Sequence, residues 1–557
     1  MTLTHIAMLT LARQVGSVHR TRRAAWRAPL TVASLALALS TACKDYLTGV
    51  GKDQDPNHVS TLSDPGPLYL SVQTAQAVQF EGGLGRIAAM YVQQIAGAAR
   101  QQQAVDLYQS QPTDIDSYFS SVYAAGGLVD VRAIQDLAQA RGDSTMSGIA
   151  KVYEALIMGT ATSFWGDIPY RQANQPNTTP ALDPQQQIYG DVQAKLDTAI
   201  TFLSKTGRTN IGPGQFEIVY TGAGTSTLQS LYTQVAYTLK ARYYMHLAER
   251  DATNYARARA AALNGISSPA NDMNWFNAGN ATSQNIFYQF QGQRGDLGPS
   301  TAMINLMGSR INAGVDTPDR LAFYFLDYCR SVGAAGIDQN NPANYAGYRP
   351  AGDPNLPGGG GAPATAKCGD NSSATGAYSD FNFINAQGNG TRTIPGFRSP
   401  AVTYAETELI LAEASYQIAG GGGGGIAAAQ PYLNAVRTNE VYGADQNGPI
   451  TFPAQTLIPA TLQNIMEEKY IDLFLIPESW NDFKRTCLPY IAPAPADPAA
   501  ATPGTQYVRR LPYGLNEIST NPNIAAAAAN FSPFTPMYED PNPCPPLNYT
   551  TSTPRAY

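Results

Sequence analysis

One stretch of the sequence, residues 265–400, combines aromatic rings with amide and arginine side chains, which is the mixture that binding of a neutral polymer requires. Sugar rings have apolar faces that lie flat on aromatic side chains, while their hydroxyls form hydrogen bonds with amides, carboxylates and arginines. Peptides use similar surfaces, and packing of the aromatics against helices is the alternative interpretation for each residue. The predicted ligand-contact residues are Trp275, Tyr288, Arg294, Tyr345 and Tyr348, and the same mixture includes Phe276, Phe290, Gln291 and Arg349.

Covalent or metal chemistry has no comparable signature in the sequence. Only His58 and His246 follow residue 42, and no G-x-S-x-G, H-E-x-x-H or C-x-x-C motif occurs. Residues 338–341 and 271–272 could ligate calcium, but neither completes an EF-hand loop, so a solvated polar loop is favoured. We predict no catalytic residue, metal or cofactor. A surface hydrolase stays open as an alternative, because a glycosidase needs only two carboxylates that face each other in a cleft.

The composition supports a folded protein and argues against a nucleic-acid partner. Hydrophobic residues make up 43% of the 557 residues, enough for a substantial core. Charged residues make up only 14%, against about 25% in an ordinary soluble protein. A protein that binds nucleic acid would carry basic patches and a high pI, whereas this chain has a net charge of −6 and a pI of 5.4.

The N-terminus has the layout of a secretory signal. Residues 1–42 contain five arginines and no acid, followed by an apolar run at 30–39 that is too short for a membrane span. Small residues then lead to Cys43, close to the pattern in which a cysteine is acylated and becomes the first mature residue. We predict a signal peptide over 1–42 and a lipid-anchored tether over 43–65. Ordinary cleavage near Ala42, with Cys43 an incidental thiol, is the alternative.

Four cysteines remain in the mature chain, and an exported protein with an even number of them is expected to form two bridges. Three connectivities are possible. Cys329–Cys368 and Cys487–Cys544 are favoured because each pair encloses a loop rich in glycine or proline. Free buried thiols are the alternative.

The body, predicted over residues 66–557, is mostly α-helical. Ile149, Val152 and Leu156 lie on one face of a helix that Gly166 ends. A loop-rich insert is predicted at about 265–400, a flexible glycine loop at 420–425 and a Pro/Ala/Asn-rich surface coil at about 489–557. The other predicted helical segments lie at 67–110, 115–140, 188–203, 228–249, 255–263, 404–418, 426–437 and 461–476, with short helices in the insert at 302–307 and 320–329.

Nine short blocks in this order resemble the SusD/RagB family of outer-membrane nutrient-binding lipoproteins. The resemblance implies a right-handed α-α superhelix of tetratricopeptide-like helix pairs that carries a loop-rich binding region. Two positions depart from the family, with Glu468-Lys469 in place of Glu-Arg, and Glu478-Ser479-Trp480 in place of Glu-Gly-x-Arg-Trp. The blocks are CKDYL (43–47), FWGDIPY (164–170), ARYYMHL (241–247), YARA (255–258), YAE (404–406), LAEA (411–414), LNAVR (433–437), IMEEK (465–469) and WNDFKR (480–485).

The resemblance further implies capture of a nutrient at the cell surface and its delivery to a SusC-like TonB-dependent β-barrel transporter. A glycan or oligosaccharide is the first expectation for the ligand and a peptide the second. A helical-repeat scaffold that binds only protein is the other alternative, and it predicts no small-ligand pocket in the insert. The blocks themselves have the character of scaffold. Trp165 is expected to be buried, and Glu413 and Arg437 are expected to pair between neighbouring helices.

The lipid anchor is directly testable at the mature N-terminus. We expect a chain that begins at Cys43 and carries two or three acyl groups, because two or more chains hold a protein stably on a membrane. Mass spectrometry of the N-terminal peptide measures this, and Cys43→Ser should move the protein from the membrane fraction to the soluble fraction. An unmodified Cys43 would contradict the prediction.

Overall fold

A computed structural model describes residues 64–175, 179–206, 211–350, 367–373, 378–383, 390–494, 506–541 and 544. The chain divides into two units, Met1–Ser63 and Asp64–Tyr557, and all described residues belong to the second. The predicted signal peptide, Cys43 and nearly all of the predicted tether therefore lie outside the described residues.

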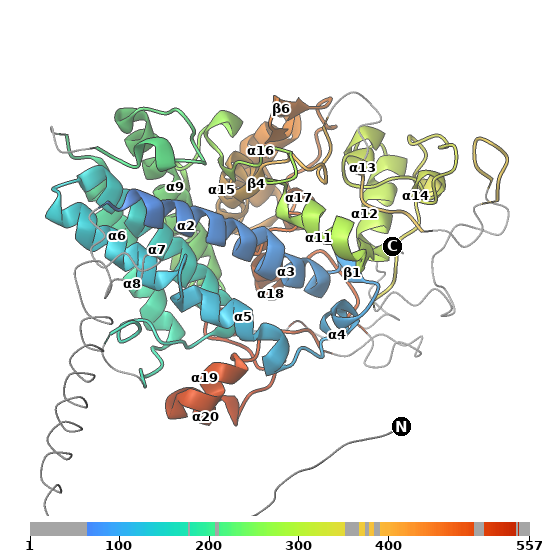
Figure 1. The fold of residues 1–557 in the computed structure, drawn as a ribbon. Coiled ribbons are helices and arrows are strands. Elements are labelled where there is room, and N and C mark those ends of the chain that lie inside the picture. Colours follow the sequence, from blue (N-terminus) through green and yellow to red (C-terminus); the bar gives the residue numbers. More distant parts are fainter. Residues whose placement is uncertain are drawn as a thin grey trace, which may run out of the picture. The chain divides into compact units, whose positions relative to one another are not determined.

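The described unit is mostly helical, as the sequence predicts (Figure 1). The N-terminal helices are α2 (Gly66–Ala77), the π-helix η1 (Val78–Leu84), α3 (Gly85–Tyr91), α4 (Gln101–Asp106), α5 (Pro112–Tyr123), α6 (Leu128–Ala140), α7 (Ser144–Trp165), α8 (Gln185–Leu203), the 3₁₀ turn η2 (Gly214–Phe216), α9 (Thr225–His246) and α10 (Thr253–Ala262). The C-terminal helices are α15 (Tyr404–Ile418), α16 (Gly422–Thr438), α17 (Leu462–Asp472), α18 (Glu478–Thr486), α19 (Leu515–Thr520) and α20 (Pro522–Ala528).

The insert contains short helices and strands between irregular segments. Its helical elements are η3 (Pro269–Asn271), α11 (Ile286–Arg294), α12 (Thr301–Asn312), α13 (Pro318–Tyr324), α14 (Tyr328–Ser331) and η4 (Pro342–Asn344). The strands of the described unit are β1 (Ile95–Gly97), β2 (Met273–Trp275), β3 (Leu297–Pro299), β4 (Ser399–Val402), β5 (Val441–Asp445) and β6 (Gly448–Thr451). They pair antiparallel as β1 with β3, β2 with β4, and β5 with β6.

The helix α7 illustrates how local sequence sets these boundaries. The Asp143 side chain caps its first turn by accepting a hydrogen bond from the Met146 amide. Gly166, at a positive φ that favours glycine, ends the helix after Trp165, which is fully buried as expected. Consecutive helices pack on each other, including α6, α7 and α8 in series, α9 with α10, and α15 with α16. No helix in the described unit is long and apolar enough to span a membrane.

The glycine run was predicted to be a flexible loop, and the structure corrects this. Gly420 and Gly421 form the turn at positive φ, but Gly422 already belongs to α16. Gly425 lies close to the preceding helix, where an added Cβ would come within 2.9 Å of the Tyr416 ring. Part of the run therefore serves a close approach between α15 and α16.

The sequence predicts a surface coil for the C-terminal segment, but several of its described residues are buried. Val508 and Leu511 are buried, and the Trp165 indole donates a 2.8 Å hydrogen bond to the Pro512 carbonyl. Lys484 and Glu539 form a buried ion pair at 2.8 Å. Two short helices, α19 and α20, interrupt the segment (Figure 1). Proline-rich composition indicated irregular backbone but did not reveal that this backbone completes the core.

The structure contains two disulfide bonds. Cys329 is bonded to Cys368 and Cys487 to Cys544, with Cα–Cα distances of 5.5 and 5.4 Å. These are the pairs that loop composition favours. The second bridge ties the C-terminal segment to the end of α18.

Glu413 and Arg437 do not pair with each other, contrary to expectation. Glu413 pairs with Lys469 at 2.7 Å and with Arg485, whereas Arg437 pairs with Glu468 at 2.5 Å. These groups are all buried. Burial alone raises the pKa of Glu413, but the charges of Arg485 and Lys469 outweigh that effect and lower it to about 2.

Removal of the Glu413 charge should destabilise the protein strongly. We expect Glu413→Gln to cost about 3–5 kcal/mol near pH 7, because it leaves buried cations without their partner. The lowered pKa means that ionised Glu413 stabilises the fold above about pH 4.5, and that this stabilisation is lost as the pH falls towards 2. The difference in the free energy of unfolding between wild type and Glu413→Gln should therefore become smaller as the pH falls through this range. Urea unfolding at several pH values measures it. Glu440→Gln, at an exposed position, should change stability by less than about 0.5 kcal/mol. Equal losses in the two variants would refute the role of Glu413.

Candidate ligand-binding site

A polar and aromatic pocket lies where the insert meets the C-terminal helices. Strands β2 and β4, hairpin strand β5 and helices α13, α15, α16 and α17 all contribute to its lining. Its volume is about 70 Å³, several times the roughly 10–15 Å³ that one water molecule requires. The pocket therefore suits one substituent of a ligand rather than the whole of a polymer.

Strand β2 supplies the pocket through its alternating side chains. Met273 and Trp275 are buried, at 0% and 1% exposure, whereas Asn274 between them lines the pocket. This alternation follows from the period of two in a strand. Phe276, the next residue, is 37% exposed. β2 pairs with β4 so that Trp275 lies opposite Ser399, which brings Arg398 and Pro400 to the same pocket.

Arg398 is the most unusual residue of the lining. Its guanidinium lies 5.4 Å from the centre of the Phe276 ring, a cation–π distance. Its Nε is buried and has no hydrogen-bond partner. In the described part of the chain no side-chain hydrogen bond or ion pair forms at Arg398.

Other polar atoms of the lining also lack partners in the described residues. They include the Asn274 Oδ1, the Asp472 Oδ2 and the Arg320 Nε. A buried polar atom without a hydrogen bond costs about 1–3 kcal/mol, so these atoms favour a ligand or ordered water in the pocket.

The acids of the pocket are restrained by their surroundings. Arg320 binds Asp472 at 2.6 Å and Glu468 at 2.7 Å. Burial, together with Glu468, raises the pKa of Asp472 to about 6 in spite of Arg320. Asp272 accepts a 2.6 Å hydrogen bond from the Tyr404 amide, and burial raises the pKa of its carboxyl well above the usual range. Asp272 is thus held towards its neutral form.

Two of the residues predicted to contact ligand lie in the core instead. Trp275 packs edge-on against Phe80, with ring centres 5.7 Å apart. Tyr345 is buried and donates a hydrogen bond to the Gln339 carbonyl at 3.2 Å. Both side chains are buried in this structure, and in the case of Trp275 the reason is its face of β2. Its neighbours Asn274 and Phe276 are the accessible residues.

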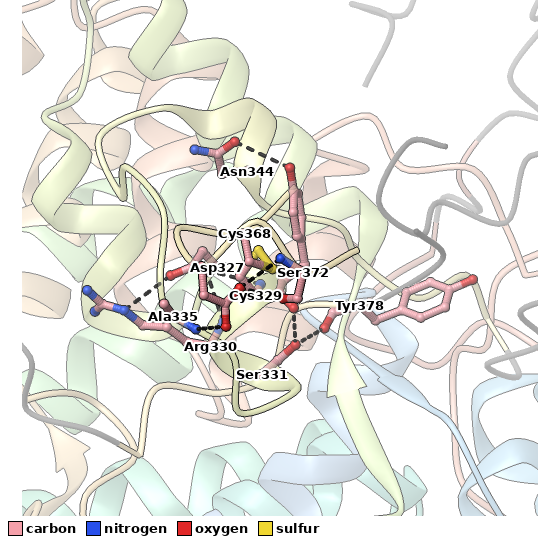
Figure 2. The surroundings of a disulfide bond; sticks show 11 residues. Asp327, Cys329, Arg330, Ser331, Ala335, Asn344, Cys368, Ser372 and Tyr378 are labelled. Carbon is pink, nitrogen blue, oxygen red and sulfur yellow. Dashed lines mark hydrogen bonds and ion pairs between the residues drawn. A yellow bond between two sulfur atoms is a disulfide. The ribbon is translucent and has the colours of Figure 1, made fainter. Parts of the chain in front are cut away.

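Tyr348 is half-buried and stacks on Tyr378, with ring centres 4.2 Å apart and planes 16° from parallel. Its amide donates a 2.7 Å hydrogen bond to the Pro299 carbonyl. Figure 2 shows how the Cys329–Cys368 bridge and the Ser331 hydroxyl, which donates to the Tyr378 carbonyl, hold the partner segment. The Tyr378 ring points away from the disulfide (Figure 2). This pair is a second aromatic surface of the insert.

Tyr288 and Arg294 lie on α11 and line no part of the pocket. The half-buried Tyr288 ring packs edge-on against Phe383 at 5.8 Å, and the Arg294 side chain is exposed. The structure thus does not gather the five predicted residues into one site. The pocket residues that sequence reasoning missed are Asn274, Arg398 and Tyr442, and Tyr404 was assigned only to the scaffold.

The described residues contain no group of three or more His, Cys, Asp or Glu side chains placed to hold a metal ion. The site is therefore best described by its aromatic rings, its unpartnered polar atoms and one unpaired arginine.

Comparison with known proteins identifies the class to which this fold belongs. The SusD-like family model described as "Starch-binding associating with outer membrane" matches residues 56–514, and the chain belongs to this family. The SusD/RagB resemblance is thereby confirmed. Members of the family are binding proteins associated with the outer membrane. Among curated proteins, none matches the chain.

Several solved structures share the fold at low sequence identity. A SusD/RagB family protein from Bacteroides thetaiotaomicron is 20% identical, with a TM-score of 0.62, and the match covers 86% of this chain and 99% of that one. A chitin-binding protein is 19% identical, with a TM-score of 0.61 and coverage of 86% and 100%. A chitin-binding SusD homolog from Flavobacterium johnsoniae is 17% identical, with a TM-score of 0.57 and coverage of 86% and 98%. At these identities the similarity is one of fold.

Proposed function

We propose that this protein is a lipid-anchored, surface-exposed lipoprotein that binds a glycan and delivers it to a SusC-like TonB-dependent outer-membrane transporter. The observation that carries the proposal is the pocket itself, whose lining includes unpartnered polar atoms and Arg398, which lies 5.4 Å from the exposed Phe276 ring. Sugars match such a surface, because they present apolar ring faces and a dense set of hydroxyls. The family description and the chitin-binding names of two similar structures support the same ligand class.

Binding without covalent chemistry fits the state of the pocket acids. Glu468 and Asp472 both pair with Arg320, and Asp272 is held towards its neutral form by burial. A glycosidase requires one acid and one free carboxylate across the scissile bond. The pairing with Arg320 leaves Glu468 and Asp472 better placed to hold the pocket wall than to transfer protons.

A small-ligand role is favoured over a scaffold that binds only protein. The scaffold alternative predicts no pocket in the insert, whereas Asn274, Arg398 and Tyr404 converge on one. Peptide ligands remain the second candidate, since amide groups also satisfy unpartnered donors and acceptors. The two ligand classes are separated by titration.

Phe276 should contribute directly to glycan affinity. Calorimetric titration of the full-length protein with starch, chitin and other oligosaccharides is expected to identify a ligand. Phe276→Ala should then weaken binding about fivefold, equivalent to about 1 kcal/mol for the lost ring contact. Because Phe276 is 37% exposed, the melting temperature should hardly change.

Leu457→Ala provides a matched control, because Leu457 is exposed and does not line the pocket. It should bind like the wild type. If no oligosaccharide of the panel binds, the result contradicts glycan capture. If only peptides bind, the ligand is a peptide, which is the second ligand class.

Delivery to a transporter predicts a stable or transient complex in the outer membrane. The full-length lipoprotein, tagged at its C-terminus and extracted in mild detergent, should co-purify with a TonB-dependent β-barrel protein. Mass spectrometry identifies that partner. Its absence after crosslinking in intact cells would contradict delivery while leaving glycan binding intact.

A further inference from the structure

The charges that line the pocket are almost all neutralised by one another. Arg320 is bound by Glu468 and Asp472, and Arg392 is bound by Glu81 at 2.7 Å. Glu468 is shared further with Arg310 and Arg437, whose own partners include Asp316. These groups form closed ion-pair sets in which each cation has a carboxylate.

Arg398 stands outside these sets. No carboxylate of the described residues lies within ion-pair distance of its guanidinium, and its buried Nε donates to no acceptor. Asp272, another acid of the same lining, forms no ion pair with Arg398, and its carboxylate instead accepts a hydrogen bond from the Tyr404 amide. The pocket therefore presents one uncompensated positive charge beside the Phe276 ring.

An uncompensated arginine in a recess has a preferred ligand chemistry. The guanidinium presents parallel N–H donors, and the edge that includes Nε matches the two oxygens of a carboxylate. Hydrogen bonds between ionised partners are about twice as strong as neutral ones. A carboxylate seated here would satisfy the Arg398 Nε and neutralise the pocket in one step.

We infer that the pocket binds the carboxylate of an acidic sugar, so that the glycan captured by this protein contains uronic acid residues. The inference rests on the proposed glycan-binding function and names its ligand class. The carboxylate enters beside Arg398, and the sugar ring that bears it lies against Phe276. The volume of about 70 Å³ suits a carboxylate but leaves the ring outside. A uronic acid has this form, because its carboxylate projects from a ring whose face is apolar.

The decisive experiment compares each acidic oligosaccharide with its methyl ester, which has the same sugar chain but no charge. Oligogalacturonides, oligoglucuronides and oligomannuronides are each titrated against their methyl esters, using the full-length lipoprotein in detergent micelles. We expect wild type to bind at least one acidic form ten or more times more tightly than its ester. Arg398→Gln should reduce that ratio to near one, and Arg398→Lys should retain only part of it because the forked donor geometry is lost.

Two controls separate this effect from damage to the fold. Arg141→Gln removes an exposed arginine that lines no part of the pocket and should keep the full preference for the acid. Arg398→Gln should melt near the wild-type temperature, since Arg398 has no ion-pair partner to lose. Its residual affinity for the esters provides a second check that the pocket is intact.

The outcomes distinguish this inference from the function on which it rests. Equal affinity of wild type for acid and ester, or tighter binding of neutral oligosaccharides than of every acid, overturns the inference and leaves glycan binding in place. No binding of any oligosaccharide contradicts the proposed function itself. Preference for peptides with a free C-terminal carboxylate over their amides would assign the pocket to peptides and overturn the uronic acid ligand.

Discussion

The arrangement of the C-terminal helices depends on three consecutive charged residues that α17 buries. Glu467, Glu468 and Lys469 are 0%, 1% and 2% exposed. Successive side chains on a helix point about 100° apart, so three in a row can be buried only if protein surrounds the helix. Their partners come from different elements, with Arg310 on α12, Arg320 on α13, Glu413 on α15 and Arg437 on α16. Such pairs add little net stability over apolar packing, but losing one partner is costly, so they specify a single arrangement.

This network also forms one wall of the pocket. Glu468 and Asp472 reach the lining together with Arg320, which pairs with both acids, and Glu468 pairs further with Arg310 and Arg437. A second wall is built by β2, β4 and their neighbours, where the Asn274 Oδ1 and the Arg398 Nε lack hydrogen-bond partners. Ion pairs restrain the first wall, although its Asp472 Oδ2 and Arg320 Nε also lack hydrogen-bond partners. Pre-organisation of the first wall lowers the ordering cost of binding, while the second supplies the groups that a ligand satisfies.

The spacing of apolar residues along the sequence predicted the helices of the scaffold well, but it did not predict which residues line the pocket. The reasons are physical. The helices α7, α9 and α15 have long apolar faces, and these repeat at a spacing that the sequence displays directly. β2 has only three residues, too few for a period of two to stand out, so the sequence does not indicate that Trp275 faces the core while Asn274 and Phe276 are accessible. The partner of a buried charge depends on which helices meet in space, and for this reason Glu413 was assigned to Arg437 instead of Lys469 and Arg485.

The residues that identify the family and those that would select the ligand are largely different. The blocks that carry the resemblance include α17 and the helices around it, and they supply Glu413, Arg437 and Lys469 to the ion network. Asn274, Phe276 and Arg398 lie outside every block, in the insert. Similarity of fold at 16–20% identity therefore does not determine which ligand the pocket binds. Starch and chitin, which the names of the family and of two similar structures include, are both uncharged polymers, whereas the unpaired Arg398 argues for an anionic ligand. The chemistry of the site, and not the shared fold, determines whether the ligand is neutral or anionic.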